Sequence, residues 1–142
     1  MADIDPVQRM VSESEIRNLV ARLGQLADDG DLDEYLSLWM EDGEWERPDG
    51  DRFRGHAALL ARINEDRASG VQGPGTASRH VNTTLWVRVD GPDDAHAESY
   101  WLYLRNANTA PVIQLTGRYV DTFRRTSDGW KFASRRIVAD VN

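Results

Sequence analysis

The stretch "TASRHVNTTLWVRV" (residues 76–89) marks the point at which the periodicity of the chain changes. It begins with small polar residues and continues as an alternating run of the kind that forms a half-buried strand. The residues before it repeat with the period of a helix, and those after it repeat with a period of two. A helical first half followed by a stranded second half predicts an α+β fold, with helices packed on one face of an antiparallel sheet.

The first helix is predicted over residues 13–28. Apolar side chains recur there at intervals of three and four residues, which gives one buried stripe. Ser12 and Glu15 have the spacing of a capping box at its start. Gly30 then interrupts the pattern, and Asp31 is suited to cap a short second helix. The residues that this second helix would carry inward are Leu32, Tyr35, Leu36 and Trp39.

The middle of the chain changes character twice before the strands begin. Residues 41–55 contain two Asp-Gly turns around short extended pieces, and they are predicted to form a small hairpin. A third helix is expected over 56–67, and the Gly-rich segment 69–78 is expected to be a flexible loop. Four long strands follow, joined by connections short enough for antiparallel hairpins. Their predicted ranges are 78–90, 94–106, 112–125 and 130–140.

Whole-chain composition narrows the classes of function. The 142 residues fit a single domain over 1–142. A net charge of −7 argues against nucleic acid as a partner, because that partner requires clustered Lys and Arg. The chain has no cysteine, which excludes disulfides, thiolate metal sites and a cysteine nucleophile. No run of about 18 apolar residues and no secretory leader is apparent, so no membrane contact is expected and the predicted location is cytoplasmic.

Alternation sorts the strand residues into two faces. His80 and Trp86 are expected on one face of the first long strand, and Trp101 and Tyr103 fall on one face of the next. Aromatic, small and polar side chains on one face suit a ligand pocket, but they equally suit an ordinary half-solvated sheet. The opposite face of the first long strand would carry Val81, Leu85, Val87 and Val89.

The sequence lacks the common catalytic motifs, so the histidines are the main candidates for catalytic residues. There is no nucleophile elbow, no phosphate-binding loop and no H-E-x-x-H motif. His56, His80 and His96 are too scattered to predict a metal cluster, so neither a metal nor a cofactor is expected. His56 and His96 are predicted to be surface residues. His80 is a candidate general base at the mouth of a pocket, with a histidine bonded to a loop carbonyl as the structural alternative.

Six motifs spread over nearly the whole chain carry a family resemblance. They are I-x-x-L-V-x-x-x-x-x-x-A-D-D-G-D-x-D (16–33), "LWMEDGEW" (38–45), Gly55 before a helix, "RHVNT" (79–83), "GRYVDTFRR" (117–125) and "GWKFASRRIV" (129–138). Together they resemble the SnoaL-like branch of the nuclear transport factor two-like superfamily. The resemblance implies a conical α+β barrel, in which three N-terminal helices pack on a strongly curved, mainly antiparallel sheet. Its members include dehydratases, a dehydrochlorinase, polyketide cyclases and the small subunits of ring-hydroxylating dioxygenases.

The resemblance also implies a site. Asp28 and His80 match the working pair of the dehydratases and the dehydrochlorinase, and Arg135 matches an arginine of the latter. In such a pair the carboxylate fixes the imidazole tautomer, and the second ring nitrogen takes a proton from carbon. Two alternatives stay open: Asp28 as a solvated acid at a helix end, and Arg135 in a structural ion pair with Asp121. Leu23 stands where relatives that eliminate a leaving group carry Lys or Tyr, so a polar helper must come from elsewhere.

These features together predict a cofactor-independent lyase or isomerase of the dehydratase or cyclase type. It would abstract a carbon-bound proton from a hydrophobic cyclic or polyketide-like small molecule. The alternative is a non-catalytic ligand-binding or assembly subunit resembling the small subunit of the dioxygenases. A homodimer or homotrimer is expected by analogy with the family, aided by the apolar strand face described above. The predicted catalytic residues are His80, Asp28 and Arg135, and the predicted substrate-binding residues are Tyr103, Trp101, Tyr119, Trp86 and Leu23.

Overall fold

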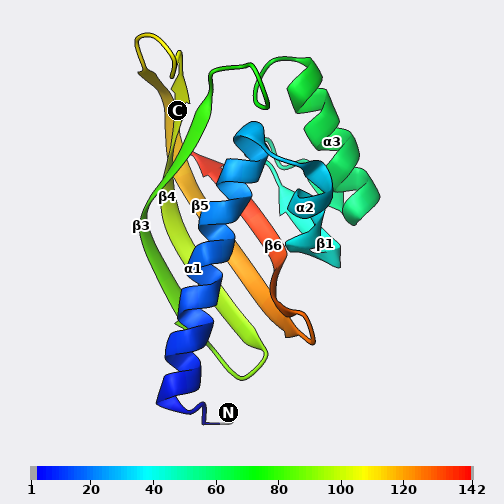
Figure 1. Ribbon diagram of the computed structural model, residues 1–142, viewed down its shortest axis with the longest axis vertical. Helices are drawn as coiled ribbons and strands as arrows, with labels where there is room; N and C mark the ends of the chain where they lie inside the picture. The colour runs from blue at the N-terminus through cyan, green and yellow to red at the C-terminus, as the bar shows by residue number, and fades with distance from the viewer. Residues whose placement is uncertain (1–2, 142) are drawn as a thin grey trace.

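The computed structural model describes residues 3–141, which form three helices and one sheet. In chain order the elements are α1 (Pro6–Asp29), α2 (Leu32–Ser37), β1 (Trp39–Glu46), β2 (Arg52–Arg54), α3 (His56–Ala68), β3 (Arg79–Val89), β4 (Asp94–Arg105), β5 (Val112–Thr126) and β6 (Gly129–Ala139). Figure 1 shows α1 lying along one face of the curved sheet, with α2 and α3 gathered beside β1. The α+β prediction is confirmed, and each long strand begins and ends within one residue of its predicted range.

The sheet is open, and the predicted closure into a barrel is wrong. Its strand order is β2-β1-β6-β5-β4-β3, so β2 and β3 are edges that do not pair with each other. Strands β3 to β6 form the expected antiparallel hairpins. The predicted hairpin of β1 and β2 is also present, but β1 in addition runs parallel to β6. With only three residues, β2 is too short to extend the sheet round to β3.

The first helix begins seven residues earlier than predicted. Asp5 caps it, because the carboxylate of Asp5 accepts a hydrogen bond of 3.1 Å from the backbone N–H of Gln8, and a proline follows at the first helical position. Ser12 therefore lies inside the helix rather than at its cap, and its side chain is buried. Asp31 does cap α2 as expected. Trp39, predicted on that second helix, instead begins β1.

A bulge in β3 reverses the predicted faces of that strand. Its register with β4 shifts between Thr83 and Trp86, and Thr84 has a φ of 47°. Beyond the shift, Val87 and Val89 point into the core, whereas Trp86 is 51% exposed. The prediction that Trp86 shares a face with His80 is therefore wrong, because the extra residue breaks the alternation. The expected exposure of Val87 and Val89 on the outer face is wrong for the same reason.

A second register shift occurs where β5 meets β6. It falls between Thr122 and Phe123, and it lets Phe132 and Arg135 both point inward although they are an odd number of residues apart. The side chains of α1 pack on this inner face, in a core that includes Trp39, Phe123 and Phe132. Among residues 3–141, no helix combines the length and the apolar character needed to span a membrane.

Candidate functional site

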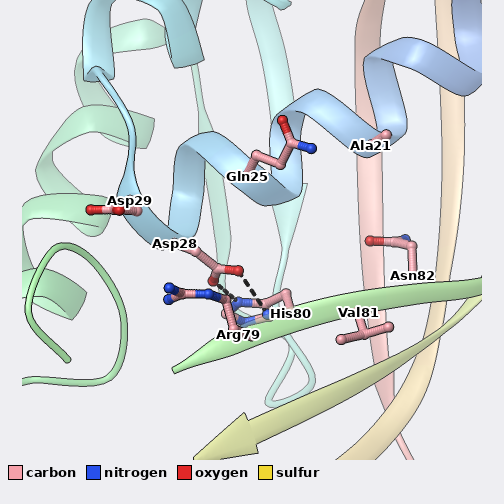
Figure 2. A pocket seen from close by; sticks show the side chains of 8 residues that line it. All are labelled: Ala21, Gln25, Asp28, Asp29, Arg79, His80, Val81 and Asn82. Atoms are coloured by element: carbon pink, nitrogen blue, oxygen red, sulfur yellow. Dashed lines mark hydrogen bonds and ion pairs between the residues drawn. The ribbon is translucent and has the colours of Figure 1, made fainter. Parts of the chain in front are cut away.

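The last turn of α1 meets the start of β3 through one carboxylate. Asp28 Oδ1 lies 2.6 Å from His80 Nδ1, and Asp28 Oδ2 accepts a hydrogen bond of 2.8 Å from the backbone N–H of His80. Figure 2 shows the two side chains pointing toward each other, with Asp29 turned away. Asp28 is only 4% exposed, so it is not the solvated acid of the alternative interpretation. In the neutral ring the proton is held on Nδ1, which leaves Nε2 as an acceptor.

The histidine borders two adjacent hollows inside the curve of the sheet. The larger has a volume of about 180 Å³ and the smaller about 60 Å³. Both are lined by Trp45, Gln72, His80, Tyr119 and Ile137. On the other side of the pair, a groove of about 480 Å³ runs between α1 and β3 (Figure 2), and it is lined by Ala21, Gln25, Asp28, Asp29, Arg79, His80, Val81 and Asn82. The imidazole is therefore accessible to a small molecule from the inner hollows.

Arg135 and Asp121 form a buried ion pair on the inner face of the sheet. Nε and Nη2 of Arg135 each donate a hydrogen bond of 2.8 Å to the carboxylate of Asp121. Burial raises the pKa of Asp121 against the opposing effect of Arg135. Burial also opposes the charge of Arg135, but the carboxylate outweighs it and raises the pKa of Arg135 above its usual value. The geometry favours the structural interpretation of Arg135, although its side chain also lines the smaller hollow.

Two predicted tyrosines occupy different positions around His80. Tyr119 stacks on Trp101 with ring centroids 5.7 Å apart, and the guanidinium carbon of Arg135 lies 3.7 Å from the centroid of its ring. Burial raises the pKa of Tyr119 to about 12, so its hydroxyl stays protonated at neutral pH. Tyr103 packs its ring 5.0 Å from that of His80, and its hydroxyl donates to the backbone carbonyl of Val71. Tyr119 therefore offers a hydroxyl to the hollows, while that of Tyr103 is engaged by the loop.

The remaining predicted residues separate into two groups. Leu23 lines the smaller hollow and Trp101 the larger. Trp86 lies on the opposite face and borders neither of them. His56 contacts the carbonyl of Trp39 at 3.1 Å, and His96 contacts Asp90 at 2.7 Å. Across residues 3–141, no three His, Asp or Glu side chains come together in a way that could hold a metal ion.

Sequence patterns missed part of the lining. Gln72 is 7% exposed, although it belongs to the segment predicted to be a flexible loop. Asp66 is buried and lines the larger hollow, where its carboxylate accepts a hydrogen bond of 3.2 Å from Arg47 and forms an ion pair with Arg62 at 3.0 Å. The i,i+4 spacing of Arg62 and Asp66 on the third helix was a visible hint of this cluster. Nothing in the loop pattern pointed to Gln72.

Comparison with known proteins gives one family match and several structural matches. A model described as the SnoaL-like domain matches residues 8–136. The chain is 31% identical to an NTF2-like protein with a cystatin-like fold from Novosphingobium aromaticivorans, with a TM-score of 0.80 and coverage of 92% of this chain and 83% of the other. A comparison with curated proteins gives no match.

Two further structures carry enzyme names. The chain is 18% identical to the hexachlorocyclohexane dehydrochlorinase LinA-type3 of Novosphingobium barchaimii, with a TM-score of 0.80 and coverage of 96% of this chain and 92% of the other. It is 19% identical to a provisionally assigned scytalone dehydratase of Novosphingobium aromaticivorans, with a TM-score of 0.73 and coverage of 93% and 86%. At these identities the likeness shows the fold alone. The family match and the shared fold agree with the motifs of the sequence, and the chain belongs to the SnoaL-like family, with an NTF2-like fold.

Proposed function

We propose that this protein is a cofactor-independent lyase or isomerase in which His80 removes a proton from a carbon atom of a small hydrophobic ring compound. The observation that carries the proposal is the Asp28 carboxylate, which lies 2.6 Å from His80 Nδ1. A ring held in this way presents Nε2 as the base, and the carboxylate stabilises the imidazolium that forms. His80 also borders both inner hollows.

The proton transfer can be followed atom by atom. Nε2 of His80 takes the proton, and the electron pair of the broken C–H bond moves toward a neighbouring electron-withdrawing group of the substrate. Departure of halide from the next carbon completes an elimination, and a hydroxyl group departs as water when it takes the proton back from Nε2 of His80. Return of that proton to another carbon instead completes a double-bond migration. Tyr119 supplies a neutral hydroxyl within the same hollows, where a hydrogen-bond donor stabilises developing negative charge.

Leu23 makes its part of the smaller hollow apolar, which limits the groups available to assist a leaving group. It is buried and lines the smaller hollow, at the position where eliminating relatives are expected to carry Lys or Tyr. An apolar side chain there neither protonates a leaving group nor binds a halide. The polar help for the reaction must therefore come from residues on the sheet or the loop, such as Tyr119.

The test measures proton abstraction directly, by mass-spectrometric detection of deuterium uptake from D₂O into a panel of cyclic ketones and hydroxylated or halogenated ring compounds. Replacing His80 with Ala should reduce exchange by about 10²- to 10⁴-fold, and Asp28→Asn should also reduce it. His96→Ala is the matched control, because His96 also pairs with an aspartate but lies away from the hollows. Deuterium exchange in the His80→Ala variant as fast as in the wild type would contradict the proposal. Ligand binding without exchange in the wild type would favour the non-catalytic subunit instead.

A further inference from the structure

Gln72 is a buried polar side chain that the proposed chemistry has not used. It lies in the Gly-rich loop between α3 and β3, it is 7% exposed, and it lines both hollows together with His80. No side-chain hydrogen bond within the described range 3–141 involves its carboxamide, and the amide atoms are not among the buried atoms that lack a partner, so the amide is open to the hollows that Gln72 lines. A polar group in such a position loses free energy if a bound molecule covers it without replacing the hydrogen bonds that water makes. An amide left free at the wall of a hollow is suited to bind a ligand.

The loop holds Gln72 in place from both sides. The hydroxyl of Tyr103 donates to the carbonyl of Val71, and Arg105 Nη1 donates at 3.2 Å to the carbonyl of Gly70. Gly73 follows with a φ of 106°, and a Cβ there would lie 2.6 Å from Cγ of Arg67. The loop therefore packs closely on both sides of Gln72. A ligand that meets its amide needs little reordering of the protein.

The charges around the hollows indicate what kind of ligand fits. Each charged group of the lining already faces an opposite charge, since Arg135 pairs with Asp121 and Arg47 pairs with Asp66. The imidazole of His80 is likewise paired with a carboxylate. What remains for a ligand are neutral groups, chiefly the amide of Gln72 and the hydroxyl of Tyr119. This pattern favours an uncharged molecule with an oxygen atom over a carboxylate or a phosphate.

The size of the larger hollow limits the molecule further. Its volume of about 180 Å³ is close to that of an engineered cavity of about 150 Å³ that binds benzene. Aromatic and aliphatic side chains form most of its walls, including Trp45, Trp101 and Ile137. A single ring with one or two small substituents fits such a space, and a fused polycyclic compound does not.

We infer that the amide of Gln72 donates a hydrogen bond to the carbonyl oxygen of an uncharged, single-ring ketone bound beside His80. The inference deepens the proposed function, because a donor at that oxygen favours loss of a proton from the adjacent carbon. Gln72 is then the residue that selects oxygenated rings over hydrocarbons. A site built to hydrogen-bond an oxygen discriminates strongly against an analogue without it.

The experiment compares 2-cyclohexen-1-one with cyclohexene as probes, using tryptophan fluorescence for affinity and the infrared carbonyl stretch of the bound ketone. The wild type should prefer the ketone by about tenfold or more, with the stretch shifted to lower frequency. Gln72→Met, which keeps the length of the side chain without the amide, should abolish both the preference and the shift, while cyclohexene affinity is retained. Gln25→Met is the matched control, since Gln25 is exposed on α1, and it should behave as the wild type.

The result that overturns the inference is a wild type without ketone preference, or a Gln72→Met variant that keeps the preference and the infrared shift. If Gln72→Met does not fold, Gln72→Ala takes its place. Loss of the infrared carbonyl shift in Gln72→Ala supports the inference, and retention of that shift overturns it. Repeating the binding measurements in the His80→Ala background separates the two proposals. Dependence of ketone binding on Gln72 without any deuterium exchange in the wild type would reject the proposed function alone, and exchange without that dependence would reject the role of Gln72 alone.

Discussion

Arg135 and Asp121 show how much a single buried contact contributes to this molecule. Both side chains are buried, and two hydrogen bonds join them. Replacing Arg135 with Met should lower the free energy of unfolding by about 3–5 kcal/mol at pH 7, because Asp121 is left without its partner. Combining it with Asp121→Leu should recover most of that loss. Urea unfolding of the wild type, the single variant and the double variant provides the measurement, and a single variant as stable as the wild type would contradict the prediction.

The same variant has a predictable pH dependence. Burial raises the pKa of Asp121, and removing Arg135 takes away the group that lowers it. The folded variant then holds a proton on Asp121 at pH values where the unfolded chain, with aspartates titrating near about 3.9, has lost it. Its stability is therefore greatest below that value and falls as the pH rises through the folded pKa. The stability gap between the variant and the wild type should be smaller at pH 4 than at pH 7.

The role and burial of some residues could be predicted from the sequence, and those of others could not. Asp28 and His80 were predicted to share a site because the family resemblance implies it, and the structure brings them together. The alternative role of Arg135 in an ion pair with Asp121 was also visible, because two opposite charges on neighbouring strands need each other when buried. Gln72 was not predictable, because a loop has no period from which burial can be derived. The loop that carries it is held by contacts with Tyr103 and Arg105 of β4, which lie more than thirty residues away in sequence.

At the scale of elements, Gly117 allows β5 to pass under Trp101. The two residues are paired across the β4 and β5 ladder. A Cβ at position 117 would lie 2.0 Å from the carbonyl oxygen of Val138 and 2.5 Å from the indole of Trp101. Gly117→Ala should therefore lower the free energy of unfolding by about 1–3 kcal/mol. Gly91→Ala, where a Cβ meets nothing within 4 Å, should change it by much less, and thermal unfolding of the two variants tests the difference.

The bulge of β3 leads to a second prediction at this scale, which concerns the backbone strain at Thr84. Thr84 is a β-branched residue at a φ of 47°, a conformation that costs about 1–2 kcal/mol for most L-residues. Asn tolerates that region better, so Thr84→Asn should raise the free energy of unfolding by up to about 1 kcal/mol. Thr83→Asn, next to it in the same strand, should not stabilise the protein. A Thr84→Asn variant that melts below Thr83→Asn would show that the bulge is not strained.

The bounds of helices and strands were predictable where local sequence determines them. The long strands and α3 appeared within one residue of their expected bounds, since turn residues and alternation are local. The start of α1 was misplaced because two plausible caps compete, and Asp5 with Pro6 prevails over Ser12 with Glu15. The predicted faces of β3 were wrong beyond its register shift, because an extra residue in a ladder leaves no mark in the alternation that precedes it.

At the scale of the whole molecule, two buried phenols affect stability at high pH. Burial raises the pKa of Tyr119 to about 12, and it also raises the pKa of Tyr35. Unfolded tyrosines titrate near about 10, so the stabilising contribution is complete below that pH and is lost as the pH rises toward the folded values. Tyr119→Phe should lose less stability than the wild type between pH 10 and 12. Unfolding experiments across that range, with phenolate absorbance recorded alongside, measure the difference, and equal losses would contradict the assignment.

The homodimer or homotrimer and the cytoplasmic location stay predictions. Val87 and Val89 belong to the core, so the surface expected to favour association is smaller than the alternation indicated. Trp86 and Tyr100 are large exposed side chains on the sheet. Sedimentation velocity of the wild type should show a dimer or trimer, and a monomer at micromolar concentration would contradict the family analogy.

The overall arrangement was only partly foreseen from the sequence. Neighbouring strands along the chain pair in most folds, and this rule yielded the order β3 to β6. The parallel contact of β1 with β6 joins residues at least ninety positions apart, such as Trp45 and Arg135, and no local pattern encodes it. The open edge at β2 follows from its three residues, a length that the hairpin prediction did not specify.

The position of β6 between β1 and β5 has a consequence for biosynthesis. The ribosome delivers this strand last among the described elements, yet it is the strand that joins the front hairpin to the rest of the sheet. Until residues 129–139 emerge, β1 has no partner along its second edge and the indole of Trp39 lacks the ring of Phe132. A nascent chain stalled before that point should therefore expose aromatic surface that is prone to aggregation and should depend on chaperones, whereas emergence of residues 129–139 allows the core to form cooperatively.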